Sequence, residues 1–419
     1  MATDAQFGST TCVEVRAEDS ELIRAASHLE IATFGQSPAW QNVTAVLTEY
    51  YANPDLEAAR VVFSAVAAHA LKAYPPAWAL AIAPPGSAKT DILESLRGLA
   101  GVHFVDEITP KTFLSGKIDE VGRKREKPAS LLHRIGPDGI LIAADFSTYT
   151  SDPKALRVVL SQLRRIYDGN YSREFGTDEN LEEREWQGRL TLLAGAVPDV
   201  DRHYALFQSL GERFIRVRWP RAGGIEAALR AMEHTYELST KLRDAVHDML
   251  RPILDPTQAA VVPSLGAEMP TRIAALSELA ARGRSYVERD RSNREIVGVP
   301  VTEGNTRLPQ QLSQIARGSA LLDGRSTVDE SDFRLVLRAA FDSMPPARRI
   351  VLVALIRGES PYALGVPPST AHRALDDLQA VGVLSGVSAE MKNAGKITLT
   401  NDVEELVRRA SLDALLSRK

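Results

Sequence analysis

The chain of 419 residues has a single cysteine, Cys12, which excludes an internal disulfide and a metal site built from several thiolates. Positive charge is not in excess: 50 lysines and arginines face 54 aspartates and glutamates, for a net charge of -4. Any contact with nucleic acid must therefore be local. The sequence also lacks an apolar run approaching the ~18 residues that cross a bilayer, and a basic-then-apolar leader. These absences predict a cytoplasmic protein with no membrane partner.

Hydrophobic residues make up 44% of the chain, enough for a sizeable core divided among several domains. Apolar residues recur at helical spacing up to about residue 71, and a Pro-Pro pair at 75–76 then stops the helix. Between 78 and 219, short apolar runs alternate with helical segments. This alternation predicts an α/β fold with a parallel sheet covered on both faces.

Residues 83–90 read Ala-Pro-Pro-Gly-Ser-Ala-Lys-Thr, directly after the predicted strand 78–82. A phosphate-binding loop, G-x-x-x-x-G-K-[ST], needs backbone N–H groups facing the phosphates, a lysine for charge and a hydroxyl for magnesium. Alanines replace both glycines, but alanine keeps its N–H. We therefore predict a site for ATP and Mg2+ and set aside an ordinary strand-to-helix turn. The predicted nucleotide-binding residues are Pro85, Gly86, Ser87, Ala88, Lys89 and Thr90, with Thr90 also on the metal.

A carboxylate at the end of a neighbouring strand usually completes such a magnesium site. Two stretches compete for this role: Asp106-Glu107 after the strand 102–105, and Asp145 after the strand 139–143. Asp145 lies far enough beyond the loop for two elements to intervene. We therefore predict that Asp145 is the catalytic carboxylate that holds the metal.

With these motifs, the chain resembles the AAA+ ATPases over roughly 55–344. The branch it is most similar to contains MoxR-type ATPases and minichromosome-maintenance helicases. The resemblance implies a P-loop AAA+ parallel sheet with a helical lid, ATP and Mg2+ as cofactors, and assembly into a homo-oligomeric, hexameric ring. The predicted parts are a helical N-terminal segment over 1–52, the α/β core over 53–222, the lid over 223–344 and a winged helix over 345–419.

Other positions acquire roles only through this resemblance. Arg213 matches the arginine finger that reaches the neighbouring subunit's nucleotide, and Arg307 matches the lid arginine that contacts the γ-phosphate. The simpler alternatives are a pair between Arg213 and an acid such as Glu212, and a solvated helix end for Arg307.

Either Asp145 is the family's magnesium aspartate and Phe146 replaces its catalytic glutamate, or Ala144 replaces the aspartate. Val197 stands where the family has a polar residue. Both departures imply slow hydrolysis.

A hairpin is expected from 169–176 and 184–197, around an acidic tip at 177–183. In helicase relatives this hairpin faces DNA in a central pore. An acidic tip would repel phosphate, which argues against a simple translocase.

The C-terminal segment is predicted to be a winged helix from helices at 347–356, 361–364 and 369–381, a strand at 396–399 and a terminal helix. The helix 369–381 has a serine cap and the position of a recognition helix. The cations predicted to contact DNA phosphates are Arg348, Arg349, Arg373, Lys392 and Lys396. Asp376 and Asp377 dilute this positive field, and winged helices also dock proteins, so a protein partner stays open.

The leading hypothesis is an AAA+ ATPase that hydrolyses ATP slowly, forms a ring and engages DNA through the winged helix. Replication, mobile-element and phage-defence roles all fit it. One alternative is a MoxR-like chaperone that remodels a protein partner, which the mildly acidic charge favours. Another is a nucleotide-gated switch without turnover, which the residues at positions 146 and 197 favour.

Overall fold

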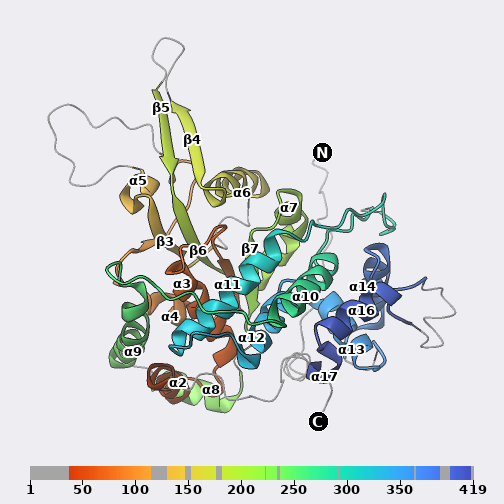
Figure 1. Ribbon diagram of the computed structural model, residues 1–419. Coiled ribbons are helices and arrows are strands. Elements are labelled where there is room, and N and C mark those ends of the chain that lie inside the picture. The colour runs from red at the N-terminus through yellow and green to blue at the C-terminus, as the bar shows by residue number, and fades with distance from the viewer. Residues whose placement is uncertain are drawn as a thin grey trace, which may run out of the picture.

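A five-stranded, all-parallel sheet in the order β2-β3-β6-β1-β7 forms the centre of an α/β fold, as predicted (Figure 1). The computed structural model describes residues 37–114, 130–146, 152–175, 182–221, 223–233, 236–290, 292–362, 365–386 and 397–416. Within those ranges, no helix is both long and apolar enough to span a membrane. The strands are β1 (Trp78–Ile82), β2 (Val102–Val105), β3 (Asp138–Ala143), β6 (Arg189–Ala196) and β7 (Phe214–Arg218).

The register of the strands defines two edges of the sheet. Ile82, the last residue of β1, pairs with Ala196 at the end of β6 and with Arg218 at the end of β7. The loop 83–88 therefore leaves from this edge, called here the carboxyl edge. Phe214 pairs with Trp78 at the opposite, amino edge. The two edges lie about 13 Å apart, from the rise of ~3.3 Å per residue in a strand.

Side chains of β1 alternate between two separate cores. Its alanines pack with the first core, which includes α3 and α4, whereas Trp78, Leu80 and Ile82 pack with the second, which includes α5 and α6. Burial on both faces explains why the strands read as continuous apolar runs. The helices that contribute to these cores include α3 (Leu56–His69), α4 (Lys89–Glu94), α5 (Leu131–Ile135), α6 (Pro153–Tyr167) and α7 (Tyr204–Ser209).

An antiparallel ribbon of β4 (Asn170–Phe175) and β5 (Glu182–Gln187) projects away from the sheet (Figure 1). It confirms the predicted hairpin, although 176–181, most of the predicted acidic tip, lie outside the described residues. At the base of the ribbon, Tyr171 lies opposite Trp186, and both side chains are buried. Trp186 Nε1 donates a hydrogen bond of 2.8 Å to the carbonyl of Gly136, which fixes the ribbon to the core.

Helices of the predicted N-terminal segment and lid pack mainly on α3 and on one another. They are α2 (Pro38–Tyr50), α8 (Ile225–Met232), α9 (Tyr236–Leu254), α10 (Met269–Gly283), α11 (Arg307–Leu322) and α12 (Glu330–Asp342). Helix α12 also contacts β7 of the sheet. Helix α11 packs closely along α3, because a Cβ added at Gly318 would lie 2.0 Å from the carbonyl oxygen of Ser64. Residues 1–36 of the predicted N-terminal segment lie outside the described ranges.

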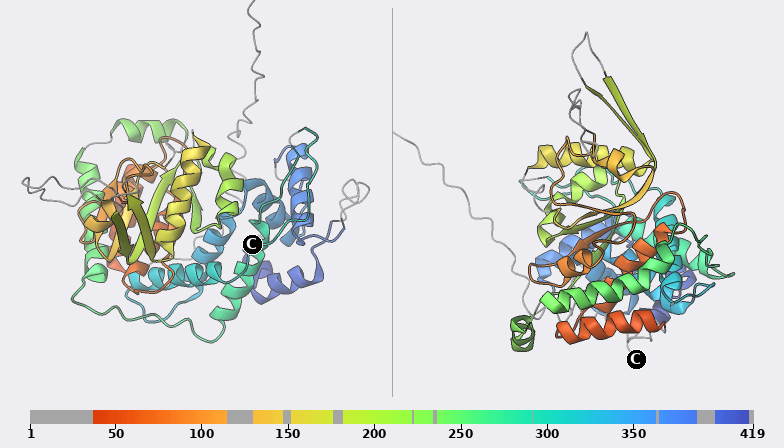
Figure 2. Two further views of the ribbon diagram at one scale, coloured as in Figure 1. Left: turned by 90° about the horizontal axis from the view of Figure 1, so that it is seen from above. Right: turned by 90° about the vertical axis from the view of Figure 1, so that its left-hand side faces the viewer.

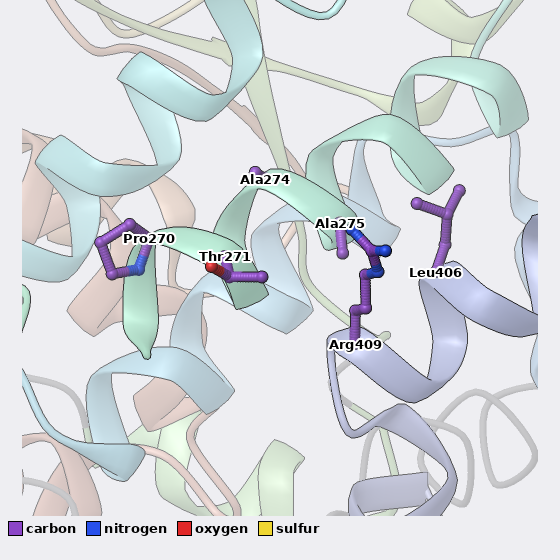
Figure 3. Close-up of a pocket in the computed structure, with 6 residues that line it drawn as sticks. All are labelled: Pro270, Thr271, Ala274, Ala275, Leu406 and Arg409. Atoms are coloured by element: carbon purple, nitrogen blue, oxygen red, sulfur yellow. The ribbon is translucent and has the colours of Figure 1, made fainter. Parts of the chain in front are cut away.

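The C-terminal helices form a group beside the lid, away from the ribbon (Figures 1 and 2). They are α13 (Pro346–Ile356), α14 (Pro368–Ala380), α16 (Asn401–Arg409) and α17 (Leu412–Leu416). Of the strand predicted at 396–399, the described part makes one antiparallel bridge, between Leu399 and Leu384. Figure 3 shows Leu406 and Arg409 of α16 beside α10, where they line a pocket of about 420 Å³. The C-terminal helices thus pack directly on the lid.

Candidate functional site

The loop after β1 keeps its one glycine at the position that needs it. Gly86 has a φ of 76°, in the left-handed region that favours glycine, whereas Ala88 has a φ of -11°. Ala83 is fully buried, and its amide donates to the carbonyl of Ala196 at 3.1 Å, which continues the hydrogen bonding between β1 and β6. The two alanine substitutions therefore fall where no left-handed conformation is required.

Hydrogen-bond donors of this loop are available for a ligand. Within the described part of the chain, the amides of Gly86, Ser87 and Ala88 donate to no protein acceptor. The Ser87 side chain is buried, and its Oγ has no hydrogen-bond partner there either. The Lys89 amide differs, because it donates to the Ser87 carbonyl. A buried hydroxyl without a partner destabilises the folded chain. Its presence is consistent with a ligand whose oxygen atoms accept its hydrogen bond.

Lys89 places a buried ammonium at the carboxyl edge. Its side chain is only 8% exposed, and Nζ donates to the carbonyl of Ala196 at 3.0 Å. Burial lowers the pKa of this ammonium, and the nearby Asp145 carboxylate opposes that effect. One carbonyl satisfies one of the three N–H groups of a lysine, so the ammonium can still donate to an anion.

Two exposed oxygen-bearing side chains flank the loop. Thr90 lies in the first turn of α4, and Asp145 follows β3, which is the second strand from β1. Strands are ~4.8 Å apart, so Asp145 starts roughly 10 Å from the end of β1, whereas Asp106, after β2, starts roughly 14 Å away. Asp145 is therefore the better placed of the two predicted carboxylates.

Among the described residues, no three His, Cys, Asp or Glu side chains group so as to hold a metal ion. A magnesium ion here would take most of its ligands from phosphate oxygens and water, as is usual for this ion. The exposed Thr90 hydroxyl and Asp145 carboxylate fit that pattern.

The position after Asp145 belongs to the core. Phe146 is fully buried, with its ring centroid 6.5 Å from that of Phe207 and 6.3 Å from that of Phe214. It cannot act on water. Two aspartates beyond Val197 could have replaced its missing polar group, but each binds arginine: Asp199 pairs with Arg202, and Asp201 with Arg216 and Arg218.

The structure brings the two predicted catalytic arginines together, but not to Lys89. Arg213 precedes β7 at the amino edge, and Arg307 Nη1 donates to the adjacent Glu212 carbonyl at 3.0 Å. Both guanidiniums lie over the Tyr167 ring, at 5.6 and 5.8 Å. The expected contact of Arg307 with a phosphate on its own loop is therefore not made in this arrangement.

Arg213 is buried rather than presented to a neighbour. It is 7% exposed, and its Nη1 donates to the Leu210 carbonyl at 2.9 Å. Burial, followed by the adjacent Arg307, lowers its pKa. The alternative pairing with Glu212 is not formed, because that carboxylate binds Arg216; Arg213 instead pairs with the Asp168 carboxylate, at 3.7 Å.

Two of the five cations predicted to contact DNA have other partners. Arg348 and Arg349 are 5% and 7% exposed; Arg348 binds Asp377 at 3.0 Å, and Arg349 binds Asp342. Their assignment as DNA contacts was wrong, because their guanidiniums hold α13 in place. Arg373 is exposed on α14, and Lys392 and Lys396 lie outside the described ranges.

Sequence reasoning missed the partners of Asp377. Besides Arg348, this carboxylate accepts from Arg289 Nη2 at 2.6 Å. These residues lie far apart along the chain, so no local spacing signals the contact. Asp377, predicted to dilute the positive field of α14, is instead neutralised by two arginines.

No protein-family model matches this chain, and no curated protein matches its sequence. Function is therefore inferred from the site itself.

Proposed function

We propose that this chain is an AAA+-type ATPase that binds ATP with Mg2+ at residues 83–90 and hydrolyses it slowly. One observation carries the proposal: a buried lysine ammonium lies at the carboxyl edge with a buried hydroxyl and three amides that have no partner among the described residues. In open α/β sheets, ligands bind outside the carboxyl ends of the strands. Such a set of donors suits a polyphosphate.

Each side chain has a defined part in this proposal. The amides of 86–88 and the Ser87 hydroxyl would bind phosphate oxygens, and Lys89 would neutralise their charge. Thr90 and Asp145 would hold the magnesium, directly or through water. Bound magnesium supplies electrostatic stabilisation of the charge that develops on the phosphate oxygens.

Slow turnover follows from what the residues near the site cannot do. Phe146 lies in an aromatic cluster, and Asp199 and Asp201 are held by arginines, so none of the three orients an attacking water. This burial of Phe146 favours, as the second candidate, a nucleotide-gated switch without turnover.

The proposal extends to assembly and partner. By resemblance, the assembly is a hexameric ring with Arg213 contributed to the neighbouring subunit's site. DNA is the proposed partner of the C-terminal helices, where the neutralised Asp377 and the exposed Arg373 support it. A MoxR-like role with a protein partner remains the alternative, and salt-dependent DNA binding distinguishes the two.

Titration of the protein with a fluorescent ATP analogue and magnesium tests the nucleotide site. Lys89→Ala should weaken binding at least tenfold, since a charge-assisted hydrogen bond contributes about 1.5–3 kcal/mol. Lys241→Ala, which removes a half-exposed lysine from α9, is the matched control and should bind as the parent does. Equal binding by all three proteins would overturn the proposal. If the parent binds ATP but releases phosphate no faster than Lys89→Ala, the ATPase is excluded and the nucleotide-gated switch is the better description.

A further inference from the structure

A segment of the lid is fixed to the helix predicted to recognise DNA. Residues 289–290 and 292–296, between α10 and α11, belong to a tight antiparallel turn closed by a bridge from Arg289 to Ile296. The Asp290 carboxylate accepts from the amides of Ser292 and Asn293 and so shapes this turn. Arg289 Nη2 then donates to the Arg373 carbonyl of α14 at 3.2 Å, so the turn and the helix are joined.

A pocket of about 650 Å³ lies between the turn and α14. It is lined by Arg289, Asn293, Arg294, Glu295, Ile296, Arg373, Asp376, Gln379 and Ala380. Most of its lining residues are polar. Besides Arg289, the turn contributes Arg294 and α14 contributes Arg373. Such a surface suits a charged ligand rather than an apolar one.

Asp377, the carboxylate beside this pocket, is compensated by two arginines, whereas Glu295 and Asp376 belong to the lining itself. Asp377 is bound by Arg289 at 2.6 Å and by Arg348 at 3.0 Å. Glu295 accepts from Asn293 Nδ2 at 3.0 Å. Asp376 is half-buried, and its charge contributes to raising the pKa of Tyr362, after burial.

Two arginines remain for a ligand. Arg294 from the lid and Arg373 from α14 are both exposed, and within the described chain neither guanidinium makes a hydrogen bond or ion pair. Arg294 also has a φ of 64°, a left-handed conformation that costs a non-glycine residue about 1 kcal/mol or more. The tight turn thus holds the Arg294 side chain at the pocket in spite of that cost.

We propose that this pocket binds the phosphate backbone of double-stranded DNA, with Arg294 and Arg373 contacting phosphates from the lid side and the helix side. Arginine suits this task because its charge is fixed and its planar donors match phosphate oxygens. The inference rests on the DNA-binding part of the proposed function and names the residues that carry it. It does not depend on the nucleotide site.

The site is composite, because its two walls come from different parts of the chain. The turn leads along the chain to Arg307, the first residue of α11, whereas Arg373 belongs to the C-terminal helices. The ion pair of Arg289 with Asp377 joins the two walls and so keeps both arginines at the pocket.

Fluorescence anisotropy with a short labelled DNA duplex, measured over a range of salt concentrations, tests the proposal. The double variant Arg294→Glu with Arg373→Glu should bind at least tenfold more weakly. Its salt slope should fall by about 2, since two phosphate contacts are lost. The matched control is Arg165→Glu with Arg202→Glu, two exposed arginines of α6 and the segment before α7, with the same change in net charge.

The control variant should retain most of the affinity. Equal losses in the two double variants, or no binding of the parent at low salt, would overturn the proposal. Because all four arginines are exposed, the melting temperatures of both double variants should match that of the parent. If charge reversal unfolds the chain, the double variant Arg294→Ala with Arg373→Ala is used in its place. If the parent and Lys89→Ala both bind DNA and neither binds ATP, the nucleotide proposal fails and the DNA proposal stands.

Discussion

At the scale of single residues, the hydroxyl oxygen of Ser87 is a buried polar atom at the proposed nucleotide site. It is buried beside Lys89 and has no partner in the part of the chain that the structure describes. A buried polar group without a partner costs about 1–3 kcal/mol, so its retention needs a compensating role. A phosphate oxygen of bound ATP would provide the missing hydrogen bond.

We therefore expect Ser87→Ala to separate stability from binding. The free energy of unfolding without nucleotide should stay the same or rise by up to about 1 kcal/mol, because an unsatisfied group is removed. ATP affinity should fall roughly tenfold, because a hydrogen bond to a charged oxygen is lost. Urea unfolding and a nucleotide titration on the same preparation measure both quantities. Unchanged affinity would contradict a phosphate contact at this hydroxyl.

At the scale of elements, the C-terminal end of α3 is joined to two strands around the partly buried imidazole of His69. His69 Nδ1 lies 2.9 Å from Thr191 Oγ1 of β6, and Arg189 Nη2 donates to the His69 carbonyl at 2.7 Å. Asp138, which begins β3, binds the same arginine at 2.8 Å. Burial and then Arg189 lower the pKa of His69 to about 4, while Asp138 acts in the opposite direction.

This junction predicts a pH-dependent stability. Between about pH 4 and 6.5 the unfolded chain protonates His69 and the folded chain does not, so stability is lost as the pH falls through that window. The loss amounts to up to roughly 3 kcal/mol. His69→Asn keeps a polar atom near Thr191 and should flatten this part of the profile, whereas His133→Asn, an exposed control, should not. Urea unfolding at a series of pH values provides the measurement, and identical slopes in the parent and His69→Asn would refute the assignment.

Much of the element order was predictable, for a physical reason. Apolar runs of β-strand length placed two strands to the residue: β1 at 78–82, which is buried on both faces, and β2 at 102–105, which is half-buried at the edge of the sheet. The helix after the loop, α4, ends at Glu94, since a turn leads into Gly98, whose φ is 96°. Contacts between distant segments were not predictable, because spacing along the chain reports only local neighbours. That is why the burial of Arg213, the position of Arg307 and the pairs of Asp377 came from the structure alone.

At the scale of the whole molecule, the nucleotide loop and the Arg213–Arg307 pair occupy opposite edges of one sheet. A single chain therefore cannot bring these groups to one nucleotide in this arrangement. In a head-to-tail assembly, which closes into a ring, one copy's amino edge can meet the carboxyl edge of the next. Arg213 would have to leave its Leu210 carbonyl partner to take part.

Mixing inactive variants tests this arrangement. Lys89→Ala and Arg213→Ala should each release little phosphate from ATP when assayed separately. An equal mixture should recover activity, because about a quarter of head-to-tail interfaces combine an intact Lys89 with an intact Arg213 from the next copy. The measurement is phosphate release by the mixture. As a control, a mixture of Lys241→Ala with Lys89→Ala shows how much activity remains when copies with an intact nucleotide loop are diluted by inactive copies. No recovery in a mixture that still assembles would place Arg213 outside the neighbouring site.

The pairs made by Arg348 and Arg349 determine where the chain can be shortened. A truncation after residue 344 would strip Asp342 of Arg349, leave the carbonyls of Gly283 and Ser285 without Arg348, and release Arg289 from Asp377. The C-terminal helices therefore cannot be removed without exposing these groups of the lid. Expression trials should keep α13 and α14 together with the lid.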